Sequence, residues 1–131
     1  MNRDNIILST AQLSDPFVRS FNPSLIRFDL PTLIENMKIE QSWKTGELKS
    51  MILLRSPSKK ILLTIVHRDT EISFYKANDL VTFQMIEGEI NLCFRNECLT
   101  LCKDEVITLN ENSRYTVDSN EESAFLLTIE S

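Results

Sequence analysis

The second half of the chain is a series of short apolar runs separated by turn-forming residues. From Lys49 onward the runs are MILL, ILLTIV, ISFY, VTFQMI, INLCF, CLTL, VITL, YTV and AFLLTI. The segments between them are SPSK, HRDTE, ANDL, EG, RNE, CKDE, NENS and SNEES. Many short strands at such spacing are typical of an antiparallel all-β sandwich or barrel. No segment here is long enough to supply the crossover helices that a parallel sheet needs.

The run VTFQMI shows the period of two that is expected of a half-buried strand. Val81, Phe83 and Met85 fall on one face, and the residues between them fall on the other. The Glu87-Gly88 pair that follows predicts a two-residue hairpin loop, in which glycine adopts positive φ at the lowest cost. A second hairpin is predicted at RNE, and its strands are apolar on both faces, which predicts a covering layer.

The first 47 residues have a different pattern and are expected to form an arm followed by a helix. Residues 1–28 show no clear period, which indicates an irregular arm with a short strand at IRF. The next segment carries a helical stripe of apolar residues at Leu30, Leu33, Ile34 and Met37, and it predicts a helix over about 30–42. Asp29 is suited to cap it. Residues 48–131 are then the barrel.

Length and composition favour a single globular domain. The chain has 131 residues, with 42% hydrophobic and 25% charged residues. Its net charge of −5 argues against binding to nucleic acid, which needs a basic face. The N-terminal segment lacks the pattern of a signal peptide, and no run approaches the roughly 20 apolar residues of a membrane span. We therefore expect a cytoplasmic protein that binds neither nucleic acid nor membrane.

Three cysteines lie in predicted strand segments, at Cys93, Cys98 and Cys102. An odd number of cysteines fits reduced thiols in a cytoplasm. Their spacing is not that of a zinc ribbon, and free cysteine is among the most buried residue types. The sequence therefore predicts three buried structural thiols, with a metal or redox role as the alternative.

The strand pattern and several turn residues resemble those of the cupins, which are small double-stranded β-helix or jelly-roll barrels. Gly88 fits the closing glycine of the first cupin motif, and LCKDEVITLNENSRYTV follows the layout of the second. In that second motif Asp104-Glu105 stand at the acidic corner, Asn110 at the usual proline and Tyr115 at the usual histidine. The resemblance covers roughly residues 48–130 and implies a cupin-type jelly-roll fold.

The resemblance also assigns the positions of the usual cupin metal ligands. Counted from Gly88, they fall on Tyr75, Ala77, Val81 and Tyr115, so none of the usual histidine and glutamate ligands is present. Alanine and valine have no donor atom, and a phenol with a pKa near ~10 is a poor ligand for a divalent ion. Ferric iron accepts tyrosinate, which leaves a non-standard metal site as an alternative. We expect no metal and no other cofactor.

The chain further resembles a subgroup of small, uncharacterised bacterial cupins. The likeness is carried by FDLPTLIENMKIEQSWKTG, which precedes the barrel, and by ESAFLLTI in the closing strand. In that subgroup the first histidine pair is reduced to His-x-Ala. This sequence departs further, because Tyr75 and Tyr115 occupy both surviving histidine positions.

Two classes of function remain open on this reading. The first is a non-catalytic module that binds a small molecule or regulates a partner. Its pocket would be lined by Tyr75, Ala77, Val81, Phe83, Met85, Tyr115 and Val117, and would suit a small apolar or aromatic ligand. The second is an isomerase or lyase that uses Tyr75 or Tyr115 as an acid-base group, which requires a depressed tyrosine pKa. No residue is singled out as catalytic.

The partner expected from the resemblance is a second copy of the chain, since small cupins usually associate as dimers. Strands that are apolar on both faces need a cover, and the arm of residues 1–28 is a candidate for wrapping a second subunit. The single histidine, His67, follows a predicted strand and is expected at a turn or on the surface.

Overall fold

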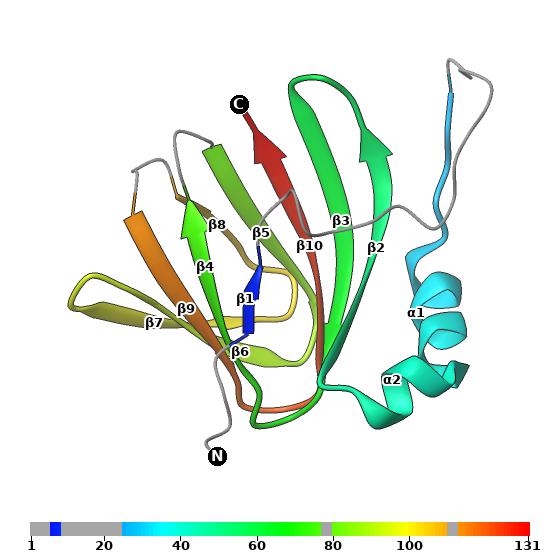
Figure 1. The fold of residues 1–131 in the computed structure, drawn as a ribbon, viewed down its shortest axis with the longest axis horizontal. Coiled ribbons are helices and arrows are strands. Elements are labelled where there is room, and N and C mark those ends of the chain that lie inside the picture. The colour runs from blue at the N-terminus through cyan, green and yellow to red at the C-terminus, as the bar shows by residue number, and fades with distance from the viewer. Residues whose placement is uncertain (1–5, 9–24, 77–79, 110–112) are drawn as a thin grey trace.

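The part of the chain that the structure describes forms two facing five-stranded sheets with two short helices packed on one side (Figure 1). The computed structural model describes residues 6–8, 25–76, 80–109 and 113–131. The helices are α1 (Leu30–Ile39) and α2 (Gln41–Thr45). The strands are β1 (Ile6–Leu8), β2 (Leu48–Arg55), β3 (Lys59–Val66), β4 (Glu71–Lys76), β5 (Leu80–Glu87), β6 (Glu89–Phe94), β7 (Glu97–Cys102), β8 (Val106–Leu109), β9 (Ser113–Ser119) and β10 (Ser123–Glu130).

The first sheet has the strand order β1-β4-β9-β6-β7, and the second has the order β2-β3-β10-β5-β8. All neighbouring strands are antiparallel except β1, which runs parallel to β4. All nine strands predicted after Lys49 are present. The expected antiparallel all-β barrel is therefore confirmed.

Three of the connections that carry the chain from one sheet to the other meet near the lower end of the barrel in Figure 1. These connections join β3 to β4, β5 to β6, and β9 to β10. Two fully buried serines lie there, at 2% and 0% exposure, and their hydroxyls bond to the backbone of the other connections. Ser119 Oγ accepts from the Thr70 N–H, and Ser123 Oγ accepts from the Glu89 N–H at 3.0 Å.

The connection at Gly88 differs from the sequence-based prediction. Gly88 has φ +87°, as expected, but β5 and β6 do not pair with each other. The two strands belong to different sheets, so the predicted hairpin is wrong and Gly88 is a corner between sheets. A hairpin and a corner have the same local signature, because both need a tight turn, and only the pairing partners distinguish them. The second predicted hairpin does form, between β6 and β7.

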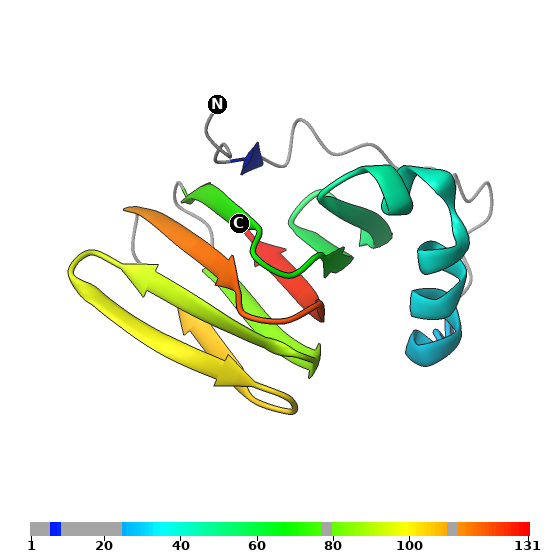
Figure 2. The same cartoon turned by 90° about the horizontal axis from the view of Figure 1, so that it is seen from below.

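The helical layer covers the outer face of the second sheet, as Figure 2 shows from below. Asp29 caps α1 by accepting from the Thr32 N–H at 3.3 Å, as predicted. The predicted single helix over about 30–42 is instead two helices that join at Glu40. Their apolar side chains Ile34, Met37 and Trp43 pack against Met51, Leu63, Ile65 and Ala124 of the sheet.

An ion-pair cluster and a ring stack fasten this helical layer to the lower end of the barrel. Lys38 Nζ lies 3.0 Å from Glu87 Oε1 and 2.7 Å from Glu122 Oε2, so α1 is tied to the end of β5 and to the connection that precedes β10. Trp43 of α2 stacks on His67, with ring centroids 3.5 Å apart. The His67 ring also lies 2.7 Å from the Trp43 carbonyl through Nε2. His67 lies between the end of β3 and a turn, as expected, but it is half-buried against tryptophan and not on the open surface.

Parts of the N-terminal arm differ from the prediction. The strand in this region is at Ile6–Leu8 and not at IRF, since residues 25–29 are irregular. β1 pairs with β4 of the same chain, in register with Ile72 and Phe74. The remainder of the arm, residues 1–5 and 9–24, lies outside the described residues. None of the helices in the described ranges is long and apolar enough to cross a membrane.

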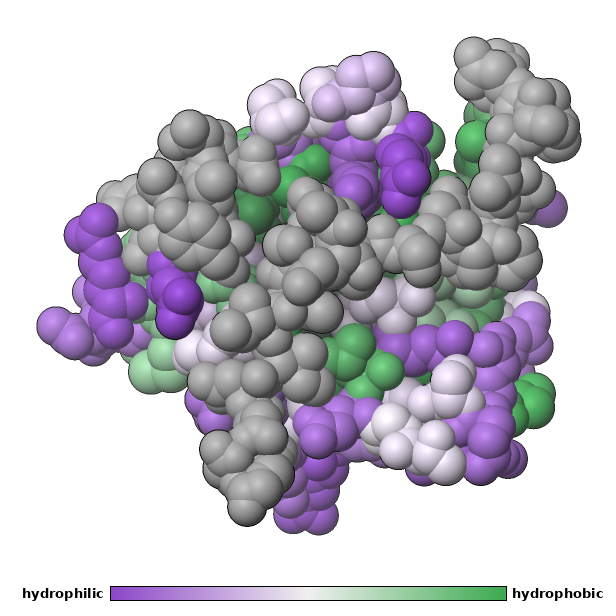
Figure 3. All heavy atoms as spheres, in the orientation of Figure 1, coloured by the Kyte–Doolittle hydropathy of each residue, from purple (hydrophilic) through white to green (hydrophobic). Residues whose placement is uncertain are grey.

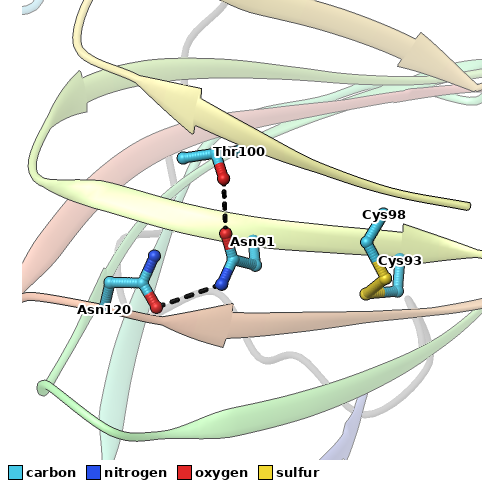
Figure 4. The surroundings of a disulfide bond; sticks show 5 residues. All are labelled: Asn91, Cys93, Cys98, Thr100 and Asn120. Atoms are coloured by element: carbon cyan, nitrogen blue, oxygen red, sulfur yellow. Dashed lines mark hydrogen bonds between the residues drawn. A yellow bond between two sulfur atoms is a disulfide. The ribbon is translucent and has the colours of Figure 1, made fainter.

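The prediction of three buried thiols is wrong. Cys93 and Cys98 face each other on the β6–β7 hairpin and form a disulfide (Figure 4), and Cys102 is a free, exposed thiol. The hairpin's outer face is polar, because Thr100 bonds to Asn91 and Asn91 bonds to Asn120. Within the described ranges no helix covers this hairpin as expected, since the helical layer lies on the other sheet. The prediction failed because it treated these short apolar runs as buried on both faces. The side chains of β6 and β7 instead alternate between the core and the surface.

Substitution of Gly88 by valine is expected to lower the free energy of unfolding by more than about 3 kcal/mol. A β-branched residue is strained at φ +87°, and a Cβ at this position would collide with Ser123 Oγ and lie 2.5 Å from the Glu122 carbonyl oxygen. Chemical denaturation monitored by circular dichroism measures the change. Asp104→Gly is the control, because Asp104 also has positive φ, at 72°, and glycine there should not destabilise. Unchanged stability of Gly88→Val would contradict the corner.

Candidate functional site

The interior of the barrel is the region to which the cupin-like positions were assigned. Val81, Phe83 and Met85 of β5 are 3%, 0% and 1% exposed, as the alternation along this strand predicted. Tyr115 and Val117 of β9 face them from the other sheet and are equally buried. The structure thus brings five of the seven predicted pocket residues into one hydrophobic core cluster.

The other two predicted positions are Tyr75 and Ala77. Tyr75 belongs to β4 and pairs with Arg114 of β9, while its side chain lies outside the described residues. Ala77 also lies outside the described residues. The predicted meeting of Tyr75 and Tyr115 in the interior therefore stays a prediction.

The residue that sequence reasoning missed is Phe74. It is the Cα partner of Tyr115 in the β4–β9 ladder and is 5% exposed. The signal was present in the alternation of ISFY, where Ile72 and Phe74 share one face, and Ile72 is also fully buried. The motif-based assignment drew attention to Tyr75 and so passed over its neighbour.

Four aromatic rings from both sheets fill this part of the core. Phe74 and Tyr115 stack with centroids 5.0 Å apart and planes within 8° of parallel. Phe83 stands edge-on to both, at 5.8 Å from each. Phe125 of β10 contacts Phe83 at 5.2 Å. Offset-stacked and edge-to-face arrangements are the favourable geometries for aromatic pairs, so the cluster contributes packing energy to the closure of the barrel.

Burial changes the chemistry of Tyr115. The side chain is 3% exposed, and removal from water raises the pKa of its phenol well above the usual value. Desolvation is the cause of this shift, because it disfavours the charged form of the phenol. A catalytic tyrosine base would need the opposite shift. The environment of Tyr115 therefore keeps the hydroxyl protonated and works against acid-base turnover at this residue.

The donor atoms at this site do not fit the metal of a typical cupin. Val81 offers no donor, and the protonated phenol of Tyr115 is a poor ligand for a divalent ion. Across the described ranges, no three histidine, cysteine, aspartate or glutamate side chains are arranged to hold a metal ion. Oxygen and nitrogen ligands with open positions are what metal-dependent chemistry requires, and the described residues of this interior do not supply them.

Solved structures with similar folds identify the architecture. A cupin superfamily protein from Desulfitobacterium hafniense matches 65% of this chain and 78% of its own, with a TM-score of 0.60 and 15% identity. A conserved protein of unknown function from Streptococcus pyogenes matches 92% of this chain and 96% of its own, with a TM-score of 0.63 and 14% identity. A cupin domain of an XRE family transcriptional regulator from Enterobacter cloacae matches 66% and 98%, with a TM-score of 0.61 and 14% identity.

These likenesses show the fold alone, because at under 20% sequence identity they carry no information on function. No protein-family model matches the chain, and no curated protein matches it either. The fold is that of a small cupin domain, as the strand spacing and the residues at Gly88 and Asp104 indicated.

The raised pKa of Tyr115 predicts a loss of stability at alkaline pH that is specific to this residue. The folded pKa lies above the unfolded value of ~10, so the stabilisation is complete below pH ~10 and decreases above it by about 1.4 kcal/mol per pH unit. Tyr115→Phe removes the titrating group and keeps the ring. Denaturation of both proteins between neutral pH and pH ~11 should show this additional loss in the wild type alone.

The same pair of proteins tests the acid-base reading directly. The chain has two tyrosines, so the difference between the ultraviolet titrations of wild type and Tyr115→Phe isolates Tyr115. We expect that difference to show no ionisation until the protein unfolds. A Tyr115 phenol that ionises in the folded protein below pH ~10 would contradict the burial argument and favour the enzyme reading.

Proposed function

We propose that this protein is a non-catalytic cupin module. It binds a small molecule or a protein partner, and this binding serves a regulatory role. The observation that carries the proposal is the chemistry at two of the cupin ligand positions. Val81 and Tyr115 are both buried in the aliphatic and aromatic core, and neither supplies a ligand suited to a divalent ion. A barrel interior packed in this way supports binding better than turnover.

The chemistry around Tyr115 supports a particular class of small ligand. The side chains that pack with it, such as Phe74 and Phe83, are aromatic or aliphatic. A molecule that entered beside them would have to be small and apolar or aromatic, with a polar group for the Tyr115 hydroxyl. The cupin domain from a transcriptional regulator illustrates that this fold occurs in regulatory proteins.

Location in the cytoplasm is part of the proposal. The chain has three cysteines, and an odd number of thiols fits a reducing compartment. A disulfide between Cys93 and Cys98 would then have to be one that forms and opens reversibly, because persistent structural disulfides are rare in a cytosol.

Elemental analysis tests the metal-free reading. Untagged protein purified after expression in metal-supplemented medium should carry less than about a tenth of an equivalent of any transition metal, because the donor set lacks imidazole and carboxylate at the described positions. Tyr115→Phe should give the same result. Near one equivalent of iron in the wild type that is lost in Tyr115→Phe would overturn the proposal and establish tyrosinate ligation. In that case the enzyme alternative, an isomerase or lyase that uses Tyr75 or Tyr115, would take its place.

The partner that we propose first is a second copy of the chain. Several large apolar side chains are exposed in the single chain, among them Ile39 at 69%, Val106 at 56% and Leu99 at 43%. Green, apolar atoms also reach the surface between polar ones on the face drawn in Figure 3. Burial of such surface between two copies would lower the free energy of the assembly.

Light scattering during size-exclusion chromatography measures the assembly. At micromolar concentration we expect a mass of two chains, and on dilution the mass should decrease toward one chain only at much lower concentration. A mass of one chain at every micromolar concentration would show that two copies do not associate through these residues, and would contradict the proposed dimer. The Tyr115→Phe protein is the control, because its change is confined to the interior and should leave the mass unaltered.

A further inference from the structure

We propose that Cys93 and Cys98 form a reversible dithiol–disulfide couple, at which an external thiol opens the bond and an external disulfide closes it. The proposal concerns the surface of the first sheet and does not rest on the function proposed for the barrel interior. The cysteines are five residues apart, on either side of the β6–β7 turn, and their Cα atoms are 4.0 Å apart.

The strand register places both cysteines on the outer face of the hairpin. Cys93 is the Cα partner of Cys98, and the next rung pairs Leu92 with Leu99. Leu92 belongs to the hydrophobic core, at 2% exposure, so its neighbour Cys93 points the other way. Figure 4 shows the disulfide on the hairpin beside the hydrogen-bonded side chains of Asn91 and Thr100.

Solvent access differs between the two cysteines and favours one site of attack. Cys98 is exposed, on the edge strand of the first sheet, whereas Cys93 is half-buried on an inner strand. Thiol–disulfide exchange requires the thiolate to approach one sulfur of the bond. Cys98 is the more exposed residue, so we expect attack at its sulfur, with Cys93 as the leaving group.

The hairpin holds the two cysteines together without the bond. β6 and β7 pair over six rungs, from Glu89 and Cys102 to Phe94 and Glu97. On the same face, Thr100 Oγ1 donates to Asn91 Oδ1 at 2.7 Å, and Asn91 Nδ2 donates to Asn120 Oδ1 at 3.1 Å. A reduced hairpin therefore keeps its two thiols opposite each other, and the couple can close again without refolding of the domain.

The chemistry balances with a thiol as the reductant. A thiolate RS⁻ attacks Cys98 Sγ, the Cys93–Cys98 bond breaks, and the Cys93 thiolate takes a proton from water. A second RS⁻ attacks the outer sulfur of the mixed disulfide, which releases RSSR and the Cys98 thiolate. Two RSH molecules are thus oxidised to RSSR, and the protein gains two electrons and two protons. The reverse sequence oxidises the protein at the expense of an external disulfide.

The position of the couple links it to the barrel interior. Phe94 follows Cys93, packs partly against the core and is the Cα partner of Tyr115 in the β6–β9 ladder. Opening of the bond removes a covalent constraint from the rung next to Phe94. The redox state of the turn end of the hairpin can therefore alter the packing around Tyr115. The rungs of the β6–β7 ladder farther from the turn remain paired.

Cys102 provides an internal control on the same strand. It is exposed, like Cys98, but its Cα partner is Glu89, and its Sγ lies 3.9 Å from Glu89 Oε1. Local desolvation raises the pKa of the Cys102 thiol, and so do the nearby carboxylates, among which Glu105 has the largest effect. A thiol with a raised pKa and no facing cysteine reacts slowly and cannot close an intramolecular bond.

The first experiment counts thiols in the folded protein. After air oxidation we expect one of the three cysteines to react with a maleimide, and after treatment with a small dithiol we expect three, without denaturant. The circular dichroism spectrum should be unchanged by reduction. Three reactive thiols before reduction, a bond that opens only in denaturant, or loss of the folded spectrum on reduction would each overturn the proposal.

The second experiment identifies the attacked and the resolving sulfur. In Cys93→Ser, glutathione disulfide should leave a stable glutathionyl group on Cys98, located by mass spectrometry. In reduced wild type the same reagent should give the intramolecular disulfide, because Cys93 displaces the glutathionyl group. Cys102→Ser should behave as the wild type does. Accumulation of the adduct on wild-type Cys98, or transfer to Cys102 instead, would show that the pair is no exchange couple.

Discussion

The closure of the barrel at one end depends on how buried backbone groups are satisfied where the chain changes sheets. Three connections converge there, and a buried polar group without a partner would cost several times the free energy of an ordinary hydrogen bond. Ser119 satisfies backbone groups of the β3–β4 connection, because its Oγ accepts from the Thr70 N–H and donates to the His67 carbonyl. Ser123 does the same for the backbone of Glu89. Each serine bonds to a segment remote in sequence, so hydrogen bonds link the β9–β10 connection to the other two.

The two sheets face different environments, because the helices pack their apolar side chains on the second sheet only. Lys38 joins α1 to Glu87 and Glu122 beside the corners, which fixes the helical layer on the second sheet. The first sheet has no such cover over its β6–β7 hairpin among the described residues, and it carries hydrogen-bonded polar side chains and the disulfide there. The same alternation that sends Tyr115 into the aromatic cluster sends Cys93 to the surface.

The sequence predicted the elements better than their partners. All nine barrel strands, the cap at Asp29 and the inward face of β5 followed from local pattern, because periodicity and turn chemistry are local properties. The corner at Gly88 and the stack of Trp43 on His67 depend on contacts between remote segments, which no local pattern encodes. Five pocket residues were placed correctly in the core, whereas Phe74 was missed because motif counting favoured its neighbour.

The stacking of Trp43 on His67 has a spectroscopic consequence. The chain contains one tryptophan, which belongs to the helical layer, and two tyrosines, one of which lies in the barrel core. Tryptophan emission therefore reports on whether α2 is docked, and the imidazole in van der Waals contact with the indole makes that signal sensitive to separation. Tyrosine absorbance reports on the barrel. The two layers of this small protein are labelled by its own chromophores, so the order in which they come apart can be observed without any added probe.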